Sequence, residues 1–489
     1  MSPTETFKPN YVFNNNMVLQ SGKPVNIYGV GGNPAFAVTV TFNGQTKSSF
    51  PDNNGKWLVT LSPMPVNALG QTLTITHGNS KFELQNIVVG EVWYCSGQSN
   101  MAMTFNELLE KRDIATNVDY SVTPFAEYKN YTNYSNIRIY HQAFNSTPFL
   151  DDVGLVRDKM RNGWFIPDCV ERLGDYSPYA VGFALKLQEV LKLPVGIIVS
   201  AVGGSSIEEW LSNQTIEDNG LALHYTEQTK PRSRLYNGMS YPLNLLTIAG
   251  LLWYQGCADS GNDKVNDWYN DMLALCAQFR NAHGNVSILS QSLVQYNENA
   301  NWSLIRQANF DLMKVIDDFY AVNGIDFGMP NEKCLPTGFT NWIHPADKYG
   351  ISKNAAEIAI TNVYGKSGYN SVAEYPVSIN AESGNLVVYY KHGVELKLST
   401  GTTVNNLEGF VDGDWEVIEN ATVNGNKITV SGGAKYSKIR YANYNVMMQG
   451  ANKLANSRYN SESPVNLFSQ KQGCQDLSVF PFREFKVNN

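Results

Sequence analysis

The sequence lacks several patterns that define whole classes of proteins. Its six cysteines are scattered without a Cys-x-x-Cys pair, which argues against a structural zinc site. No apolar run reaches the length of a membrane-spanning helix, so we expect no membrane insertion. No lysine and arginine cluster stands out and the net charge is −7, so nucleic acid is not an expected partner. With 43% hydrophobic and only 17% charged residues, the composition indicates a globular protein with a weakly charged surface.

The N-terminal segment, residues 1–16, is polar and lacks the apolar stretch of a signal peptide. Two locations fit this pattern. The protein is extracellular or periplasmic if a signal was removed, or it is virion-associated, for example in a phage tail released by lysis. Aromatic residues make up 12% of the chain, which suits a carbohydrate-facing protein, although β-rich folds use tyrosine and tryptophan as well.

Hydrophobic periodicity divides the 489 residues into three regions. Residues 1–88 read as short strands separated by turns such as Asn43-Gly44, which predicts a small β-sandwich-like domain. Residues 89–366 alternate strand and helix, which predicts a parallel sheet covered by helices on both faces. Residues 367–489 return to β-patterns and predict a second β-rich module. The strands expected in the middle region are 86–94, 195–201, 248–254 and 286–289, and the helices are 180–191, 268–279, 302–315 and 353–364.

The most informative segment is GEVWYCSGQSNM, residues 90–101. An expected strand here is followed by a turn of small and amide residues, and the turn leads to a helix expected at 101–110. Serine hydrolases place their nucleophile at such a turn, where the N–H groups of a helix start can donate to negative charge. The alternative is an ordinary Ser/Asn helix cap. Ser99, the Gly203–Gly204 pair and Asp259 each follow an expected strand, so they should share one edge of the sheet.

Residues 90–101 resemble the nucleophile block of the sialate O-acetylesterase family, a branch of the SGNH hydrolases. Further segments resemble that family in the same order along nearly the whole chain: 17–20, 194–198, 203–210, 235–239 with 242–243, 253–256, 343–345 with Lys348 and Gly350, and 481–483. The resemblance implies an α/β fold: an SGNH-type three-layer α/β/α domain with a parallel sheet, flanked by N- and C-terminal β-sandwich-like modules.

The resemblance also implies roles for individual residues. Ser99 is the expected nucleophile and His344 the expected general base. The oxyanion donors should be the backbone N–H of Ser99, an N–H of Gly203 or Gly204, and a side-chain amide. Further residues expected to bind substrate or the oxyanion are Gln98, Asn237, Gln255 and Asp259. No metal and no organic cofactor is needed for this chemistry.

Two positions depart from the family pattern. The third block usually carries an asparagine where this chain has Asp259, and a carboxylate donates a hydrogen bond only when it is protonated. Gln255 and Asn262 are alternative amide donors. An aspartate three residues before the histidine is common in SGNH enzymes, but this position is Asn341. Its carbonyl oxygen can still orient His344, and a backbone carbonyl is the other option. Asp326 and Asp347 fit that role less well.

The leading hypothesis is therefore a carbohydrate O-acetylesterase, with O-acetylated sialic acid or polysaccharide as the substrate. The rival hypothesis is a catalytically impaired glycan-binding or virion protein that retains the esterase fold. The missing signal peptide and the altered third block both favour it. A simple small-ester hydrolase is a third reading, against which the flanking β-modules argue. A homo-oligomer or virion assembly partners are compatible with the sequence.

Overall fold

The computed structural model describes residues 6–107, 128, 134–153, 163–226, 230–261, 264–294, 301–324, 343–345, 348–369, 372–398, 401–441, 467–470, 477–478 and 482–488. The chain divides into two compact units. The first comprises Met1–Ala258 and Asn270–Leu289, and the second comprises Asp259–Tyr269 and Ser290–Asn489.

The first unit begins with β-structure. Strands β1 (Lys8–Pro9), β3 (Val25–Val30) and β6 (Trp57–Leu61) form an antiparallel sheet. β6 buries every second residue, as expected for a strand with one face on a core. Four more strands join a second sheet: β2 (Val18–Gln20), β4 (Val38–Phe42), β5 (Gln45–Ser49) and β7 (Asn67–His77). The predicted turn at Asn43-Gly44 is confirmed, because both residues have positive φ (49° and 73°) and join β4 to β5 as a tight hairpin.

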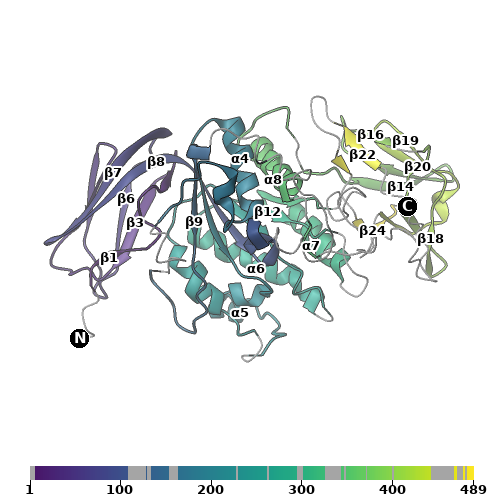
Figure 1. Cartoon of the computed structure of the whole chain (residues 1–489). Coiled ribbons are helices and arrows are strands. Elements are labelled where there is room, and N and C mark those ends of the chain that lie inside the picture. Colours follow the sequence, from purple (N-terminus) through teal and green to yellow (C-terminus); the bar gives the residue numbers. More distant parts are fainter. Residues whose placement is uncertain are drawn as a thin grey trace. The chain divides into compact units, whose positions relative to one another are not determined.

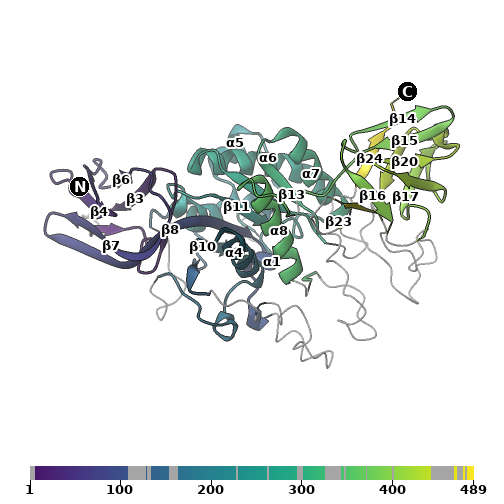
Figure 2. The same cartoon turned by 90° about the horizontal axis from the view of Figure 1, so that it is seen from above.

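Strand β8 (Ser80–Gly97) links this β-structure to the α/β part of the same unit (Figures 1 and 2). Its first half pairs with β7 in an antiparallel ladder, and its second half pairs with β10 and β11 in parallel ladders. Asn86, in the middle, has a φ of 59°, and an asparagine tolerates this left-handed conformation better than most residues. One continuous strand therefore runs across residue 88, where the sequence predicts a domain boundary.

The α/β part of the first unit is built on parallel strands. β9 (Ile137–His141), β10 (Val195–Ala201), β8 and β11 (Gly250–Tyr254) lie side by side in that order. The register pairs Gly97 with both Ala201 and Tyr254, so three strands end at the same level. The segments that follow them meet at one edge of the sheet, which is where ligands bind in open α/β folds.

Helix α4 (Pro178–Leu191) packs on β9 and β10, and residues at both of its ends favour a helix with these bounds. Ser177 caps it by accepting the backbone N–H of Ala180, and Pro178 occupies the first turn, where no N–H partner is needed. Lys192 ends it in the left-handed conformation. Further α-helices among the described residues include α1 (Ser99–Ala102), α5 (Asn213–Asp218), α6 (Lys264–His283), α7 (Trp302–Val315) and α8 (Lys348–Asn362).

Most of the predicted elements of the middle region are confirmed to within a few residues. β10 and α7 have the predicted bounds, and β12 (Ser287–Gln291) and β11 are shifted by at most two residues at either end. The helix predicted for 101–110 is interrupted: α1 (Ser99–Ala102) ends early, residues 105–107 are helical again, and residues 108–110 lie outside the described residues. β13 (Phe319–Val322), which the sequence analysis did not predict, lies beside Ser292 and contacts α7 and α8 within the second unit.

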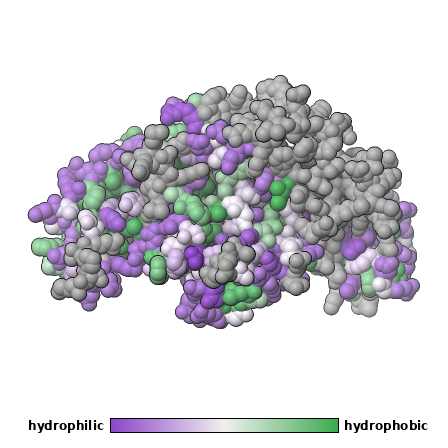
Figure 3. Space-filling model, turned by 60° about the horizontal axis from the view of Figure 1, so that its bottom comes forward, coloured by the Kyte–Doolittle hydropathy of each residue, from purple (hydrophilic) through white to green (hydrophobic). Residues whose placement is uncertain are grey.

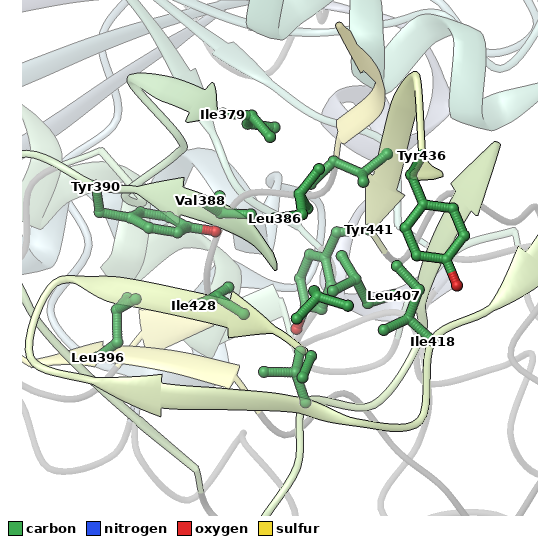
Figure 4. Packing of buried hydrophobic residues seen from close by; sticks show 14 of the residues in the cluster. Ile379, Leu386, Val388, Tyr390, Leu396, Leu407, Ile418, Ile428, Tyr436 and Tyr441 are labelled. Atoms are coloured by element: carbon green, nitrogen blue, oxygen red, sulfur yellow. The ribbon is translucent and has the colours of Figure 1, made fainter. Parts of the chain in front are cut away.

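The C-terminal part of the second unit is β-rich. Its strands are β14 (Ser378–Glu382), β15 (Asn385–Tyr389), β16 (Glu395–Leu398), β17 (Leu407–Val411), β18 (Asp414–Val417), β19 (Ala421–Asn424), β20 (Lys427–Val430), β21 (Lys438–Tyr441), β22 (Leu467–Gln470), β23 (Leu477–Ser478) and β24 (Phe482–Lys486). Side chains from several of these strands form one core, in which Leu386, Val388, Ile428 and Tyr441 are at most 1% exposed (Figure 4). A shared core of this kind holds the strands together by burial of apolar surface.

The visible surface mixes hydrophilic and hydrophobic residues over its coloured part (Figure 3). Large apolar side chains that are well exposed include Phe144, Phe149 and Leu150, which follow β9. In the described ranges, every helix is too short or too polar to cross a bilayer.

Candidate functional site

The turn after β8 is forced into a special shape by Gly97. Its φ is 132°, and a Cβ atom there would lie 2.2 Å from the carbonyl oxygen of Tyr254. Only glycine fits such a close approach. The backbone N–H of Gln98 then donates to the same Tyr254 oxygen at 3.0 Å, which extends the parallel pairing by one residue. The chain turns into α1 directly afterwards, and this places Ser99 at the end of the strand.

Gln98 connects this turn to the one after β11. Its side chain does not cap α1. Instead, its Oε1 accepts the backbone N–H groups of Gly256 and Ala258, both at 3.1 Å. Gln98 is only 2% exposed, so these bonds hold two backbone amides in a place with little access to water. The residue predicted to bind substrate therefore has a clear role in shaping the site.

The turn after β10 brings Gly203 next to the candidate nucleophile. A Cβ atom built on Gly203 would lie 3.7 Å from the Cβ of Ser99, so the two backbones are close neighbours. The N–H of Ser205 donates to the carbonyl of Val202 at 3.3 Å, and Gly204 has a φ of 73°. A positive φ at the third residue of a β-turn is typical of type II and favours glycine.

Side chains beneath this turn fix its position. Ser205 Oγ donates to the Val202 carbonyl at 2.9 Å and accepts the indole N–H of Trp210 at 2.9 Å. The Gln255 Nε2 donates to the Ser205 carbonyl at 3.2 Å. Gln255, one of the two alternative amide donors, thus uses an N–H of its amide to join the ends of β10 and β11. Both side chains are buried, so the contacts are shielded from water.

Ser99 itself is half-exposed, whereas Gln98 and Asn100 on either side of it are buried. Gly203 and Gly204 are exposed. The exposed glycines therefore lie beside the half-exposed Ser99, with Gly203 in close contact with it. This arrangement suits nucleophilic attack on a carbonyl carbon with donors for the resulting oxyanion.

A thiol also lies in β8, four residues before Ser99. Cys95 is buried, and burial raises the pKa of its thiol well above the ordinary value. The reactive form of cysteine is the thiolate, so Cys95 stays inert at neutral pH. Ser99 is therefore the better nucleophile of the two.

The other predicted site residues are placed as follows. Asn237 is buried, and its side-chain amide donates to the carbonyl of Thr147 at 3.2 Å, while its backbone carbonyl accepts from Asp151. It therefore anchors the segment after β9. Asp259 is 3% exposed and belongs to the second unit. His344, also in the second unit, is half-exposed and precedes α8.

Four predicted positions lie outside the described residues: Asn262, Asp326, Asn341 and Asp347. Their proposed roles stay predictions. Within the ranges that the structure describes, no group of three or more His, Cys, Asp and Glu side chains is placed to hold a metal ion.

Sequence reasoning missed two residues at this edge. The Tyr225 hydroxyl donates to the carbonyl of Ala258 at 2.8 Å, and the Lys230 ammonium donates to the carbonyl of Gly204. Neither residue is part of a motif in the sequence analysis. Their contacts join positions far apart in sequence, and no local sequence pattern predicts them.

The family of this chain follows from comparison with known proteins. Residues 89–334, half of the chain, match the family model described as "Carbohydrate esterase, sialic acid-specific acetylesterase". The chain belongs to this carbohydrate esterase family. The matched range begins within β8 and includes the turns that carry Ser99, Gly203 and Gly256.

Individual relatives agree with this assignment to the carbohydrate esterase family. The chain is 31% identical over 279 residues to sialate O-acetylesterase of Homo sapiens, covering 53% of this chain and 49% of that protein. It is 27% identical over 306 residues to the Mus musculus protein of the same name, with 53% of each covered. The chain thus spans about half the length of the curated relatives it matches.

The fold is shared over a longer stretch. The crystal structure of a carbohydrate acetylesterase from Xanthomonas citri superposes with a TM-score of 0.76 at 20% identity, covering 97% of this chain and 98% of that one. This likeness shows that the chain has the α/β fold of carbohydrate esterases, with β-rich parts on both sides in sequence.

Proposed function

We propose that this protein is a carbohydrate O-acetylesterase with Ser99 as the nucleophile. One observation carries the proposal: the half-exposed Ser99 lies at the end of β8, next to Gly203. A Cβ atom built on Gly203 would lie 3.7 Å from the Cβ of Ser99. This juxtaposition offers a hydroxyl and backbone donors to the same carbonyl group. The family of the chain supports an acetyl ester as the substrate.

The reaction follows from these groups. The Ser99 Oγ attacks the acetyl carbon, and its proton passes to the imidazole of His344. The carbonyl oxygen becomes an oxyanion, which the N–H groups of Ser99 and of the Gly203–Gly204 turn stabilise. The bond to the sugar oxygen then breaks, and this oxygen takes the proton from His344. Water repeats the sequence on the acetyl-enzyme and releases acetate.

The fold supports the finer assignment to the SGNH type. Parallel strands β9, β10, β8 and β11 end at one edge, and each of the last three is followed by a segment that resembles an SGNH block. We place a three-layer α/β/α domain at the centre of the chain. The β-rich parts that precede and follow it would then be sandwich-like modules.

The substrate we favour is an O-acetylated sialic acid or an acetylated polysaccharide. The relatives named above are sialate O-acetylesterases, and the family description specifies sialic acid. The exposed Phe144 and Phe149 follow β9 and offer aromatic faces of the kind that stack on sugar rings.

Acetate release from a panel of acetylated sialic acids and polysaccharides tests the proposal. Wild type and Ser99→Ala are compared on each substrate, with p-nitrophenyl acetate as a neutral reference ester. We expect turnover that disappears in Ser99→Ala and is fastest on acetylated sialic acid. Equal release by the two proteins would reject the serine mechanism, and no release by either would favour a protein that only binds glycans.

A further inference from the structure

The side chains of Tyr225 and Lys230 reach two of the turns that surround Ser99. The Tyr225 hydroxyl donates to the carbonyl of Ala258, after β11, at 2.8 Å. The Lys230 Nζ donates to the carbonyl of Gly204, after β10, at 2.5 Å. The same ammonium lies 4.6 Å from the centroid of the Tyr225 ring, which is a cation–π distance. One pair of side chains therefore joins both turns.

The bond from Lys230 matters because it adds a charged donor at Gly204, whereas the bonds from Ser205 and Gln255 hold the turn one residue further on. Two adjacent glycines leave the backbone unusually free to change conformation. The peptide between Gly204 and Ser205 is held at its N–H by Val202, and Lys230 holds it at its carbonyl. A charged donor makes a stronger hydrogen bond than a neutral one. Lys230 thus restricts the turn that carries the expected oxyanion donors.

Tyr225 plays the corresponding part at the turn after β11. Gln98 accepts the N–H of Ala258, and Tyr225 donates to its carbonyl, so the polar groups of Ala258 are held from both sides. The next residue is Asp259, which stands where relatives of the family usually carry an amide donor. The orientation of the turn at Ala258 therefore affects the direction of the Asp259 side chain, which follows it in the chain.

We propose that Tyr225 and Lys230 are positioning residues for ester hydrolysis, and that Lys230 also places a positive charge beside Gly203–Gly204 that stabilises the oxyanion. The proposal rests on the proposed esterase function. A fixed cation near the oxyanion would then offset part of the loss expected from Asp259 in place of the family's usual amide donor.

Steady-state kinetics on p-nitrophenyl acetate test the idea, since this ester has no carboxylate for a lysine to bind. The variants are Lys230→Ala, Lys230→Arg and Tyr225→Phe, with Lys47→Ala on the exposed face of β5 as the matched control. We expect Lys230→Ala to lower kcat about tenfold with KM nearly unchanged, because only transition-state stabilisation is lost. Lys230→Arg should keep most of the wild-type kcat, and Lys47→Ala should have the kcat and KM of the wild type.

A double variant separates a joint role from two independent ones. If the pair acts as a unit, Lys230→Ala combined with Tyr225→Phe loses less than the product of the single effects. If Lys230→Ala does not fold, Lys230→Gln replaces it, since glutamine keeps a neutral donor, and an intermediate kcat is expected.

Two results would overturn the proposal. One is an unchanged kcat in Lys230→Ala, or in Lys230→Gln where that variant replaces it. The other is a rise in KM confined to acetylated acidic sugars, which would make Lys230 a ligand of the substrate carboxylate instead. Failure of the esterase function itself looks different, because the wild type would then show no Ser99-dependent release of acetate at all.

Discussion

The side-chain oxygen of Gln98 accepts the backbone N–H of Gly256 at 3.1 Å. The residue immediately before the candidate nucleophile is thereby tied to the turn after the neighbouring strand. A second bond from Ala258 makes the link rigid. The position of Ser99 relative to the turn after β11 is thus built into the fold and does not depend on a bound substrate.

Replacing Gln98 tests this link. Gln98→Ala leaves two buried amide donors without an acceptor and should lower the free energy of unfolding by about 2 kcal/mol. Gln98→Glu keeps the acceptor oxygen, so its free energy of unfolding should fall much less. Urea unfolding followed by tryptophan fluorescence measures both. Equal losses in the two variants would mean that the acceptor oxygen is not what stabilises the turn.

Three glycines of the site should respond differently to alanine. Gly97→Ala should fail to fold or lose several kcal/mol, because its Cβ would overlap the Tyr254 oxygen and its φ is 132°. Gly204→Ala meets no atom within 4 Å but has a φ of 73°, and should cost about 1 kcal/mol.

Gly203→Ala should keep its melting temperature, since the added Cβ makes only an ordinary contact at 3.7 Å with the Cβ of Ser99. It should nevertheless slow acetate release by about tenfold, because that methyl group narrows the approach to the hydroxyl. Calorimetry measures the melting temperature of each glycine variant, and turnover on p-nitrophenyl acetate measures its activity. A Gly203→Ala protein with normal turnover would place the reacting carbonyl elsewhere.

Asp259→Asn should raise kcat. By its resemblance to the family pattern we expect the buried Asp259 carboxyl to replace an amide donor, and an asparagine is nearly the same size. One oxyanion donor is worth about 10²–10³ in kcat, so even partial restoration should give about tenfold. Asp259→Ala is the matched control, because it removes the carboxyl without adding a donor. A lower kcat in Asp259→Asn would show that the carboxyl itself takes part.

His283 should make the protein less stable in mild acid. Its half-buried ring packs against Phe279 at 4.3 Å between centroids, and burial lowers its pKa from 6.5 to about 4. Its Nδ1–H donates to the carbonyl of Leu246 at 2.9 Å. Between pH 6.5 and pH 4 the unfolded chain binds more protons than the folded one, so stability falls as pH falls.

The expected loss across that window is about 1–2 kcal/mol, since solvent screens a half-buried ring. Urea unfolding at pH 7 and pH 4.5 measures it in wild type and in His283→Gln, which does not titrate. The slope with pH should be smaller in the variant. The same slope in both proteins would assign the acid sensitivity to other groups.

Local sequence patterns were sufficient for most of the secondary structure. β10 and α7 have the predicted bounds because each is a continuous apolar or amphipathic stretch with clear ends. The short α1 could not be predicted in the same way. The sequence 101–110 has helical propensity and residues 105–107 are helical, but the break at 103–104 and the bonds of Gln98 to the turn after β11 have no local sequence signal.

The candidate site was predictable in part for the same reason. Ser99 and the glycine pair stand in recognisable motifs directly after strands, so the shared sheet edge followed from topology. Tyr225 and Lys230 carry no motif, and their bonds to Ala258 and Gly204 join segments far apart in sequence. Only the folded chain reveals such contacts. Asn237 shows the reverse case, since a motif residue serves to anchor Thr147.

The most direct test of the central claim is to trap the acetyl-enzyme. The protein is mixed with p-nitrophenyl acetate, quenched in acid within the first turnover, digested and analysed by mass spectrometry. We expect one acetyl group on the peptide that contains Ser99, and none on that peptide in Ser99→Ala. A stable acetyl group on another residue, or full turnover by Ser99→Ala, would contradict the assignment of Ser99 as the nucleophile.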